Sequence, residues 1–512
     1  MLRKRHKYSR PVSSRSGISR SVILLTALLL SACSTVNFDY PKQASFASEE
    51  VADTDLGEAY DDWTELHGEN SGFYPLIDGI DALGARLRLI EAAEKTIDAQ
   101  YFLMKGDTAG ELFAGSLLRA ADRGVRVRIL LDDVFTTVKD DELALLNQHP
   151  NIEVRLFNPI SRRGIYYLNY AGDFKRANRR MHSKSFIVDN SLSVIGGRNI
   201  ADEYFQLKEQ GEFLDFDVLT IGPVTRGVSA QFDDFWNATK SLPMEALSQK
   251  FSDEDLERVR REIDEEMAAG QLSVYAKAVN SKHMLELVNG SAKLYTGAAT
   301  VVNDTSEKLS NPVGEQYMTL VNQLEELTFG AEKDIVIINP YFIPTEAGLE
   351  YWRKIIDRGI DVTIITNSLS STNHVTVHSA YTRYRKPMVE SGATIYEARS
   401  SKDNPRTLHT KLVINDRRYV FVGSLNLDPR SIDINAEMGV VIDSPELAAD
   451  ILDGLEEALE SEAWQLKIND KGGLDWHLVS DGQSTLASRE PDSSAWERFL
   501  SVFYRILPEG QL

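Results

Sequence analysis

Two stretches of this chain follow one pattern: His182-Ser-Lys-Ser-Phe-Ile-Val-Asp189 and His409-Thr-Lys-Leu-Val-Ile-Asn-Asp416. Each reads His-x-Lys-x(4)-Asp, and the copies begin 227 positions apart (409 − 182). The histidine and the lysine stand two residues apart at the start of an apolar, β-branched run that is typical of a strand. On a strand this spacing points both side chains to the same face. A core histidine beside a snorkelling lysine explains one such stretch, but two copies with identical spacing favour a function.

The sequence around the motif is repeated as well. Ala93-Glu-Lys-Thr-Ile matches Ala331-Glu-Lys-Asp-Ile, and Asp122-Arg-Gly-Val-Arg-Val matches Asp357-Arg-Gly-Ile-Asp-Val. The order is kept while the offset drifts from 238 (331 − 93) to 235 (357 − 122) to 227, so only loop lengths change. This pattern indicates two halves of one fold.

Each half follows the same predicted order of elements. We expect a strand, a helix (residues 110–121 and 347–356), a strand opened by Asp-Arg-Gly, the motif strand, a short turn and a further strand (residues 192–195 and 419–422). Strands that alternate with helices predict an α/β fold, in which a central sheet carries helices on its faces and is built twice.

The residue types in the motif suit phosphate chemistry. Lys184 and Lys411 carry the charge that binds an oxyanion, while the neighbouring His182 or His409 attacks phosphorus or carries a proton. A zinc site built from the two histidines is the alternative, but a lysine two residues from each would repel the cation.

A glycine turn follows the second strand of each half, as Gly196-Gly-Arg-Asn199 and Gly423-Ser-Leu-Asn426. Glycine lets the main chain approach a ligand closely, and an asparagine amide donates to a phosphate oxygen. We therefore predict that Asn199, Asn426 and Ser424 bind phosphate.

A catalytic imidazole also needs a carboxylate on its second nitrogen. Each half offers one acid on a later strand-like run, Asp217 in the first half and Glu437 in the second. We predict that Glu437 orients His182 and that Asp217 orients His409. An acid at a strand edge with no such role is the alternative.

These residues together resemble the phospholipase D superfamily, whose signature is the paired His-x-Lys-x(4)-Asp followed by Gly-Gly or Gly-Ser and Asn. The resemblance covers residues 75 to 465. It implies two tandem phospholipase D-like αβα sandwich domains related by a pseudo-two-fold axis, with one shared active site. It also implies a phosphohistidine intermediate, no metal and no cofactor. The motif aspartates, Asp189 and Asp416, join the predicted catalytic set, and by the common pattern of the superfamily His182 is the nucleophile.

The sequence around the motifs is similar to that of bacterial cardiolipin synthases, as in Ile152-Glu-Val-Arg-Leu-Phe-Asn-Pro and Asn435-Ala-Glu-Met-Gly. This resemblance implies a phosphatidyltransferase that acts on phospholipids, with phosphatidylglycerol as the first candidate substrate and phosphatidylethanolamine as the second. A phospholipase D-type hydrolase would use the same residues with water as acceptor. The oligomeric state stays open.

Charge argues against a nucleic-acid partner. The chain has 56 Lys and Arg against 77 Asp and Glu. Removal of the leader, which holds seven basic residues and no acid, leaves 49 against 77, a formal charge of −28. A nuclease needs basic residues to displace phosphate counterions. Basic clusters survive at residues 175–180 and 383–386, and the first either borders an anionic headgroup site or is a solvated loop.

The N-terminus resembles a lipoprotein leader. Seven basic residues precede the apolar run 21–30, which is too short to span a bilayer. The run ends in Leu30-Ser-Ala-Cys33, and Cys33 is the only cysteine of the chain. We predict lipidation of Cys33. Because Ser34 rather than aspartate follows it, we expect a membrane-anchored lipoprotein that faces the periplasm at the outer membrane.

The predicted organisation has six parts. These are the signal peptide at 1–32, an acidic and polar tether at 33–75, the first phospholipase D-like domain at 76–240, a partly helical connecting insert at 241–315, the second domain at 316–465, and a C-terminal extension at 466–512.

Overall fold

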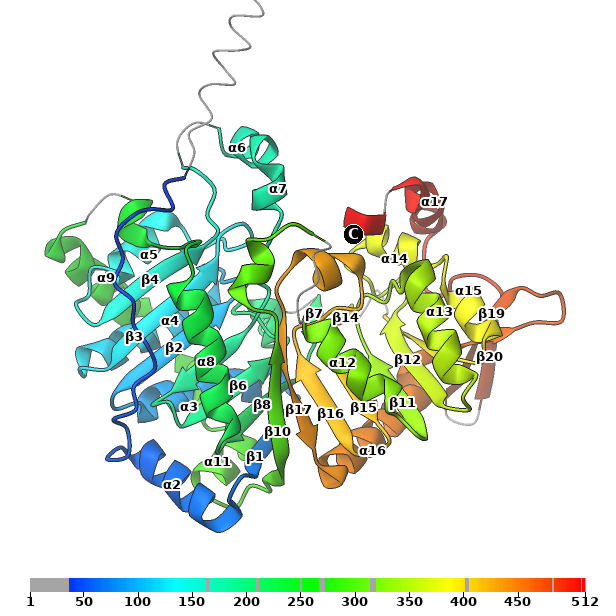
Figure 1. Ribbon diagram of the computed structural model, residues 1–512, viewed down its shortest axis with the longest axis horizontal. Coiled ribbons are helices and arrows are strands. Elements are labelled where there is room, and N and C mark those ends of the chain that lie inside the picture. The colour runs from blue at the N-terminus through cyan, green and yellow to red at the C-terminus, as the bar shows by residue number, and fades with distance from the viewer. Residues whose placement is uncertain are drawn as a thin grey trace, which may run out of the picture.

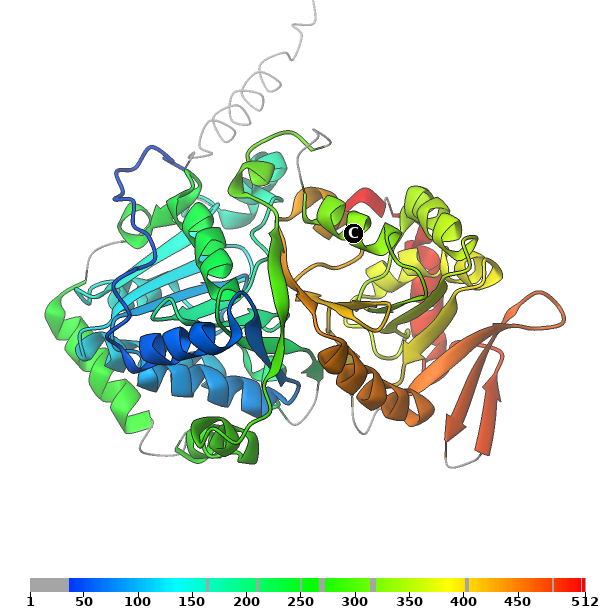
Figure 2. The same ribbon diagram turned by 60° about the horizontal axis from the view of Figure 1, so that its bottom comes forward.

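A computed structural model describes residues 36–162, 165–208, 211–248, 251–266, 272–313, 319–400, 405–480, 483–507 and 509–511. The predicted signal peptide and Cys33 therefore lie outside the described residues. In the described part, 18 strands pair into one sheet that runs through two lobes, with β10 and β17 between them (Figures 1 and 2).

The first lobe has helices on both faces of its part of the sheet. Its elements are α3 (Gly79–Ala92), β2 (Thr96–Tyr101), α4 (Thr108–Asp122), β3 (Arg126–Asp132), α5 (Asp140–Leu146), β4 (Ile152–Phe157), α6 (Tyr166–Gly172), α7 (Phe174–Ala177), β5 (Ser185–Val188), β6 (Leu192–Gly196), β7 (Glu212–Leu214), β8 (Asp217–Ile221), α8 (Val224–Asn237) and β9 (Ser241–Pro243).

The second lobe repeats this order. Its elements are α12 (Leu320–Phe329), β11 (Asp334–Ile338), α13 (Thr345–Ile356), β12 (Asp361–Asn367), α14 (Val375–Tyr381), α15 (Arg385–Glu390), β13 (Thr394–Ala398), β14 (Arg406–Leu408), β15 (Leu412–Asn415), β16 (Tyr419–Gly423), β17 (Met438–Asp443) and α16 (Pro445–Glu462). The helices and strands predicted from the repeated order are confirmed in both lobes.

The pairing of the strands has an internal two-fold pattern. The first lobe runs β4-β3-β2-β5-β6-β8, and the second runs β13-β12-β11-β15-β16-β17. On the outer side β9 pairs with β4, and β18 (Ala463–Ile468) pairs with β13. Two further strands join them: β1 (Ser71–Leu76) pairs with β8, β10 (Tyr295–Asn303) pairs with β17, and β1 pairs with β10. The tandem, pseudo-symmetric α/β sandwich is thus confirmed.

The core explains why the lobes stay together. One apolar cluster lies under α3 and α4, and another under α12 and α13, each confined to its lobe. The central cluster is shared, because Phe232 and Trp236 of α8 belong to the same cluster as Val422 of β16 and Leu447 of α16. Since apolar burial is the main favourable term in folding, this shared cluster holds the two halves in one body.

The tether predicted at 33–75 is wrong for residues 36–75. Their main chain binds charged side chains of the first lobe: the oxygen of Ser45 accepts from Arg128 at 2.9 Å, and the amide of Ala47 donates to Asp233 at 2.9 Å. The chain then forms α2 (Asp55–His67) and enters the sheet as β1. Side chains add to these bonds, since Nζ of Lys42 donates to the oxygen of Ser241 at 2.6 Å and the indole of Trp236 donates to the hydroxyl of Ser45 at 2.9 Å.

Other boundaries also differ from prediction. The insert at 241–315 is partly helical as expected, with α9 (Asp253–Glu266), α10 (Leu272–Val279) and α11 (Lys282–Val288), but it also supplies β10 to the sheet. The C-terminal extension continues the second lobe's sheet with β18 (Ala463–Ile468), β19 (Leu474–Ser480) and β20 (Gln483–Ala487), and ends near α17 (Ala495–Phe503). In the described ranges, each helix is too short or too polar to cross a bilayer.

Candidate active site

Both motif histidines lie where the two lobes meet. The amide of His182 donates to the oxygen of Ala436 at 2.8 Å, next to a parallel bridge between Met181 and Ala436. In the same way β14 pairs in parallel with β7, and the amide of His409 donates to the oxygen of Leu214 at 2.7 Å. Each histidine is therefore positioned by main-chain bonds from the other lobe.

The carboxylates come from the other lobe too. Nδ1 of His182 donates to Oε2 of Glu437 at 2.7 Å, as predicted. Nδ1 of His409 donates to Oδ2 of Asp215 at 2.6 Å, and both pairs are buried. In this arrangement a catalytic pair forms only when both halves are folded and joined.

The prediction that Asp217 orients His409 is wrong. Asp217 instead forms buried ion pairs with Arg86 at 2.9 Å and Arg198 at 3.5 Å. The strand register gives the reason: Gly196 pairs with Asp217 and Gly423 pairs with Gly439. Asp217 is therefore the counterpart of Gly439, and Asp215 is the counterpart of Glu437.

A sequence signal for Asp215 exists. A proline follows each of the two equivalent strands, Pro223 after β8 and Pro445 after β17. Asp215 and Glu437 both lie eight residues before their proline (223 − 215 and 445 − 437). Asp217 begins β8, whereas the carboxylate that contacts the histidine lies two residues before this strand.

The two lysines lie beside the histidines and are almost completely buried. Nζ of Lys184 donates to the main-chain oxygen of His182 at 2.5 Å, and Lys411 makes the equivalent bond to His409. Burial lowers the pKa of Lys184 to about 7 and that of Lys411 to about 8. An anionic phosphate between them would favour the charged form of both.

Burial and the neighbouring lysines lower the pKa values of both imidazoles. Burial and then the charge of Lys411 lower the pKa of His409 to about 3. Burial, Lys184 and Lys411 hold the pKa of His182 well below its usual value. A neutral imidazole whose Nδ1 donates to a carboxylate has a free lone pair on Nε2, which is what a nucleophile or a base requires.

The motif aspartates do not belong to the site. Asp189 accepts from the amides of Lys95 and Thr96 at 2.8 and 2.7 Å, and Asp416 accepts from the amides of Glu332 and Lys333 at 3.0 and 2.7 Å. Each lies seven residues beyond its histidine, on the order of 20 Å along an extended chain. The predicted catalytic role of Asp189 and Asp416 is corrected to a structural one: they hold the start of a neighbouring strand.

The turn geometry supports that structural role. Asp189 and Asp416 both have positive φ, 45° and 53°, and so do the residues that follow them. Two successive residues at positive φ form a type I′ turn, which aspartate and asparagine tolerate better than most residues. The final position of the motif is thus set by the hairpin.

The predicted phosphate-binding residues divide into three cases. Asn199 is engaged within the protein, because it accepts from the amide of Leu103 at 3.2 Å and donates to the hydroxyl of Tyr204 at 2.9 Å. Ser424 donates to Oε2 of Glu437 at 2.5 Å, so it supports the carboxylate. The buried Oδ1 of Asn426 has no hydrogen-bond partner among the described residues. Because Oδ1 is an acceptor, Asn426 would have to bind a phosphate oxygen through its Nδ2 donor.

Aromatic rings that the sequence did not single out line the site. Phe102 meets the ring of His182 edge-on, with 4.7 Å between centroids, and Phe213 stacks on His409 at 5.1 Å. Tyr204 also contacts the edge of His409 at 5.3 Å. Apolar walls exclude water and strengthen the electrostatic interactions inside.

A second layer of charge supports the loops that carry the catalytic residues. Arg180, in the basic cluster before His182, pairs with Asp132 at 3.1 Å, and Asp132 also accepts from the amide of Met181. Asp304 accepts from the amide of Glu437 at 3.0 Å and pairs with Lys308. Arg180 is buried, so this part of the cluster is structural.

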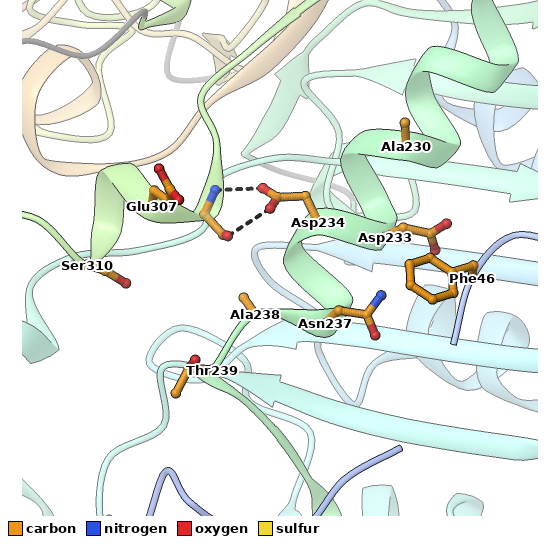
Figure 3. Close-up of a pocket in the computed structure, with 10 residues that line it drawn as sticks. Phe46, Ala230, Asp233, Asp234, Asn237, Ala238, Thr239, Glu307 and Ser310 are labelled. Carbon is orange, nitrogen blue, oxygen red and sulfur yellow. Dashed lines mark hydrogen bonds between the residues drawn. The ribbon is translucent and has the colours of Figure 1, made fainter. Parts of the chain in front are cut away.

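Two cavities need separate assignments. One, of about 600 Å³, lies by the end of α8 (Figure 3). Both carboxylate oxygens of Asp234 in its lining accept hydrogen bonds from Ser306, so this acid is engaged within the protein. A second, of about 450 Å³, is largely apolar and adjoins the catalytic carboxylate. Its lining includes Asp215, Phe213, Leu408, Leu412, Ile451 and Leu455. The second cavity offers an apolar environment next to His409.

Among the described residues, no group of three or more His, Cys, Asp or Glu side chains is arranged to hold a metal ion. The two histidines instead face carboxylates and ammonium groups, which is a set of charges suited to an anionic phosphodiester.

Comparisons with known proteins agree with this geometry. A family described as "Cardiolipin synthase, PLD-like domain" matches residues 87–236 and 325–459. Cardiolipin synthase C of Escherichia coli K12 is 36% identical over 455 residues, 86% of this chain and 96% of its own length. Cardiolipin synthase A of Pseudomonas syringae is 26% identical, covering 71% of this chain and 63% of its own.

One solved structure shows the same fold. It is the phosphatidylserine synthase of Haemophilus influenzae, with a TM-score of 0.55 and 14% identity, covering 88% of this chain and 98% of that one. The family match spans more than half of the chain, and the E. coli relative exceeds 30% identity over most of it. The chain therefore belongs to the cardiolipin synthase family of phospholipase D-like enzymes.

Proposed function

We propose that the protein is a phosphatidyltransferase that moves a phosphatidyl group between glycerophospholipids. The observation that carries the proposal is the pair of buried imidazole–carboxylate contacts, His182–Glu437 and His409–Asp215, each built across the two lobes. Two imidazoles at one junction suit a two-step displacement at phosphorus, with one as nucleophile and one as acid and base.

In the first step, Nε2 of His182 attacks phosphorus. The bond from phosphorus to the headgroup oxygen breaks, and His409 delivers its proton to the leaving alcohol. The phosphatidyl group is then held on His182. Lys184, Lys411 and the amide of Asn426 stabilise the non-bridging oxygens.

In the second step, neutral His409 takes the proton of the incoming hydroxyl. The oxygen of that hydroxyl attacks phosphorus, and the bond to Nε2 of His182 breaks. When a second phosphatidylglycerol supplies the hydroxyl, the products are cardiolipin and the glycerol released in the first step. Water as acceptor would give phosphatidic acid, which is the hydrolase alternative.

The carboxylates support this division of roles. Although burial opposes it, the charges of His409 and Lys411 hold the pKa of Asp215 below its usual value, so this carboxylate stays ionised. Burial raises the pKa of Glu437 to about 7. A fully ionised partner favours the imidazolium that a general acid needs, and the anionic substrate raises the histidine pKa further. His409 therefore suits the acid, and His182 the nucleophile.

The substrate class follows from the same site. The lysines and Asn426 recognise a phosphodiester, and the apolar cavity beside Asp215 receives the acyl part of a lipid. Phosphatidylglycerol is the proposed donor and acceptor, with phosphatidylethanolamine as the second donor candidate. Lipidation of Cys33 would anchor the enzyme to the periplasmic face of the outer membrane.

Lipid analysis tests the transferase. Cells that lack every other cardiolipin synthase should accumulate cardiolipin only when this protein is supplied, as measured by mass spectrometry. A His182→Ala variant expressed to the same level is the matched control. Phosphatidic acid in place of cardiolipin, in the presence of excess phosphatidylglycerol, would establish the hydrolase instead.

The anchor needs its own test. Cys33→Ala should abolish incorporation of a palmitate analogue and move the protein out of the membrane fraction. Continued labelling of that variant would contradict lipidation at this residue.

A further inference from the structure

Large apolar side chains that are strongly exposed gather in two places. Of nineteen such residues in the part of the chain that the structure describes, nine belong to two short segments. The first segment is α6–α7 with the residue before it: Ile165, Tyr167, Leu168 and Phe174. The second is α17 with the 3-10 turn that follows it: Trp496, Phe499, Val502, Phe503 and Ile506. Scattered exposed apolar residues are normal, but clusters of this kind indicate an interaction surface.

The α17 cluster has the pattern of a helix that lies on an apolar medium. Its exposed residues follow spacings of three, three, one and three, which place them on one helical face. Trp496 stacks on Phe499 with 5.4 Å between ring centroids, and Trp496 is 64% exposed. The opposite face is anchored, because the oxygen of Ser501 accepts from Ser379 of α14 at 2.5 Å. The fold thus presents the apolar face outwards.

The α6–α7 cluster has a similar composition. Tyr167 is 81% exposed, and Tyr170 meets Phe174 edge-on. Tyrosine and tryptophan are the side chains that prefer the boundary between lipid headgroups and hydrocarbon.

Each cluster is connected to one catalytic histidine. Asn178, which follows α7, accepts from Arg430 at 2.9 Å, and His182 comes four residues later. On the other side α17 packs on α14, and the loop before α14 contains Ser371. The oxygen of Ser371 accepts from Thr407 at 2.8 Å, and His409 comes two residues after Thr407. In Figure 1 both clusters lie along the upper edge, on either side of β7 and β14.

Two aromatic rings connect His182 with the protein surface. Phe135 is exposed, and its ring lies 4.9 Å from Phe102, which contacts His182. A lipid that enters between the two clusters would meet apolar surface up to the nucleophile.

The start of the described chain lies at the same place. The guanidinium of Arg176 in α7 lies over the ring of Phe38 at 5.0 Å. Cys33 precedes Phe38 by five residues, a span of at most about 18 Å. A lipid attached to Cys33 would therefore bring a membrane within reach of α6 and α7.

We infer that α6–α7 and α17 form one docking face that lies on a phospholipid bilayer and directs the catalytic junction towards it. This deepens the proposed function, since it explains how a water-insoluble substrate reaches the site. The chain has a net charge of −21, so attraction to an anionic lipid surface is weak, and apolar insertion has to supply the binding. Docking should therefore persist at high salt, where surface charges are screened.

A single-cysteine experiment tests the face. Cys33 is the only cysteine, so a full-length Cys33→Ser protein gives a background without thiols. Phe499→Cys or Leu168→Cys is added and labelled with an environment-sensitive fluorophore. Leu66→Cys is the matched control, because Leu66 is an apolar residue that is 78% exposed on α2, at the opposite edge of Figure 1.

Vesicles of phosphatidylethanolamine and phosphatidylglycerol should shift the emission to the blue at positions 499 and 168, at both 0.1 M and 1 M salt, and leave position 66 unchanged. A shift that follows protein concentration without vesicles would indicate contact with a second copy and overturn the proposal. Equal shifts at all three positions, or none at 499 and 168, would do the same.

An activity split separates docking from catalysis. Combining Trp496→Ser, Phe499→Ser and Ile506→Ser should reduce turnover of vesicle substrate by about tenfold or more. Turnover of a water-soluble short-chain phosphatidylglycerol should stay within about twofold, because the catalytic residues are untouched. Equal loss on both substrates would contradict the docking role, while absence of turnover in the parent protein on either substrate would reject the proposed function itself.

Discussion

The two lobes each contribute one histidine, but the carboxylates that these histidines contact differ: His182 contacts Glu437, and His409 contacts Asp215. The residue after the strand glycine also differs, because Gly197 lies beside Asp215 and Ser424 lies beside Glu437. The Ser424 hydroxyl donates to Glu437. A β-carbon at Gly197 would overlap the carboxylate of Asp215. The two sites are therefore similar in geometry but differ in how each carboxylate is stabilised.

This difference has a chemical meaning. Asp215 keeps a lowered pKa through the charges of His409 and Lys411, whereas burial raises the pKa of Glu437 to about 7. The internal repeat supplies similar parts, but a two-step transfer requires an acid and a nucleophile with different proton affinities. The carboxylates supply that difference, because both histidines keep the same lysine neighbour.

The largest expected effect comes from removing either imidazole. His182→Ala and His409→Ala should each lower turnover of phosphatidylglycerol about 10³-fold or more, because each step needs both groups. The double variant should be little worse than either single one. Cardiolipin formation measured by mass spectrometry checks this, with thermal unfolding as the control for folding. Near-normal turnover in one single variant would contradict a shared site.

The leaving group should distinguish the two histidines. A phosphodiester with a nitrophenol leaves without a proton, so His409→Ala should retain measurable single-turnover release, and His182→Ala should not. The phosphoryl adduct should accumulate on His182 in the first variant, as peptide mapping would show. An acid-labile adduct on His409 would reverse the roles and leave the fold and family unchanged.

The third comparison concerns two aspartates that are two residues apart. Asp215→Asn should lower kcat about 10²-fold or more with little loss of stability, because it removes the charge that stabilises the imidazolium of His409. Asp217→Asn should lower the free energy of unfolding by about 3 kcal/mol, because it leaves Arg86 buried without its partner.

Kinetics and denaturant unfolding of the two variants check this. If Asp217→Asn lost activity at full stability while Asp215→Asn remained active, the assignment drawn from the strand register would be wrong.

Sequence reasoning recovered the parts that the repeat determines. The alternation of strands and helices, both histidines, both lysines and Glu437 follow from motifs present twice. The role of Asp215 does not follow from the motifs, because it depends on which residues pair across β6 and β8. The roles of Asp189 and Asp416 were misjudged for a related reason: a fixed spacing in the motif reflects the hairpin as much as the chemistry.

Other features left no periodic signal. Residues 36–54 attach to the first lobe through scattered main-chain and polar side-chain contacts. The strand β1 joins the sheet of both lobes although its sequence is short and contains glycine and proline. Phe102 and Phe213 contact the histidines from distant segments. Such contacts depend on the three-dimensional packing of the two lobes, which one sequence does not specify locally.

The smallest expected effect concerns Ser424 and sharpens the comparison at the level of a single hydrogen bond. The positive charge that develops on His182 needs an ionised Glu437, so activity should rise with pH through the pKa of that carboxyl, about 7. The hydrogen bond from Ser424 favours the ionised form and lowers this pKa. Ser424→Ala should therefore move the acid limb of kcat/KM to higher pH.

A lost hydrogen bond to a charged group corresponds to about 1.5 kcal/mol, or roughly tenfold, at pH 6. That energy is about one pKa unit, so the loss should fade only above about pH 9, where Glu437 is ionised in both proteins. Asp215 has no such donor at Gly197, so the two carboxylates should behave differently at low pH. If Ser424→Ala lowered kcat/KM equally at every pH, the serine would act by packing instead.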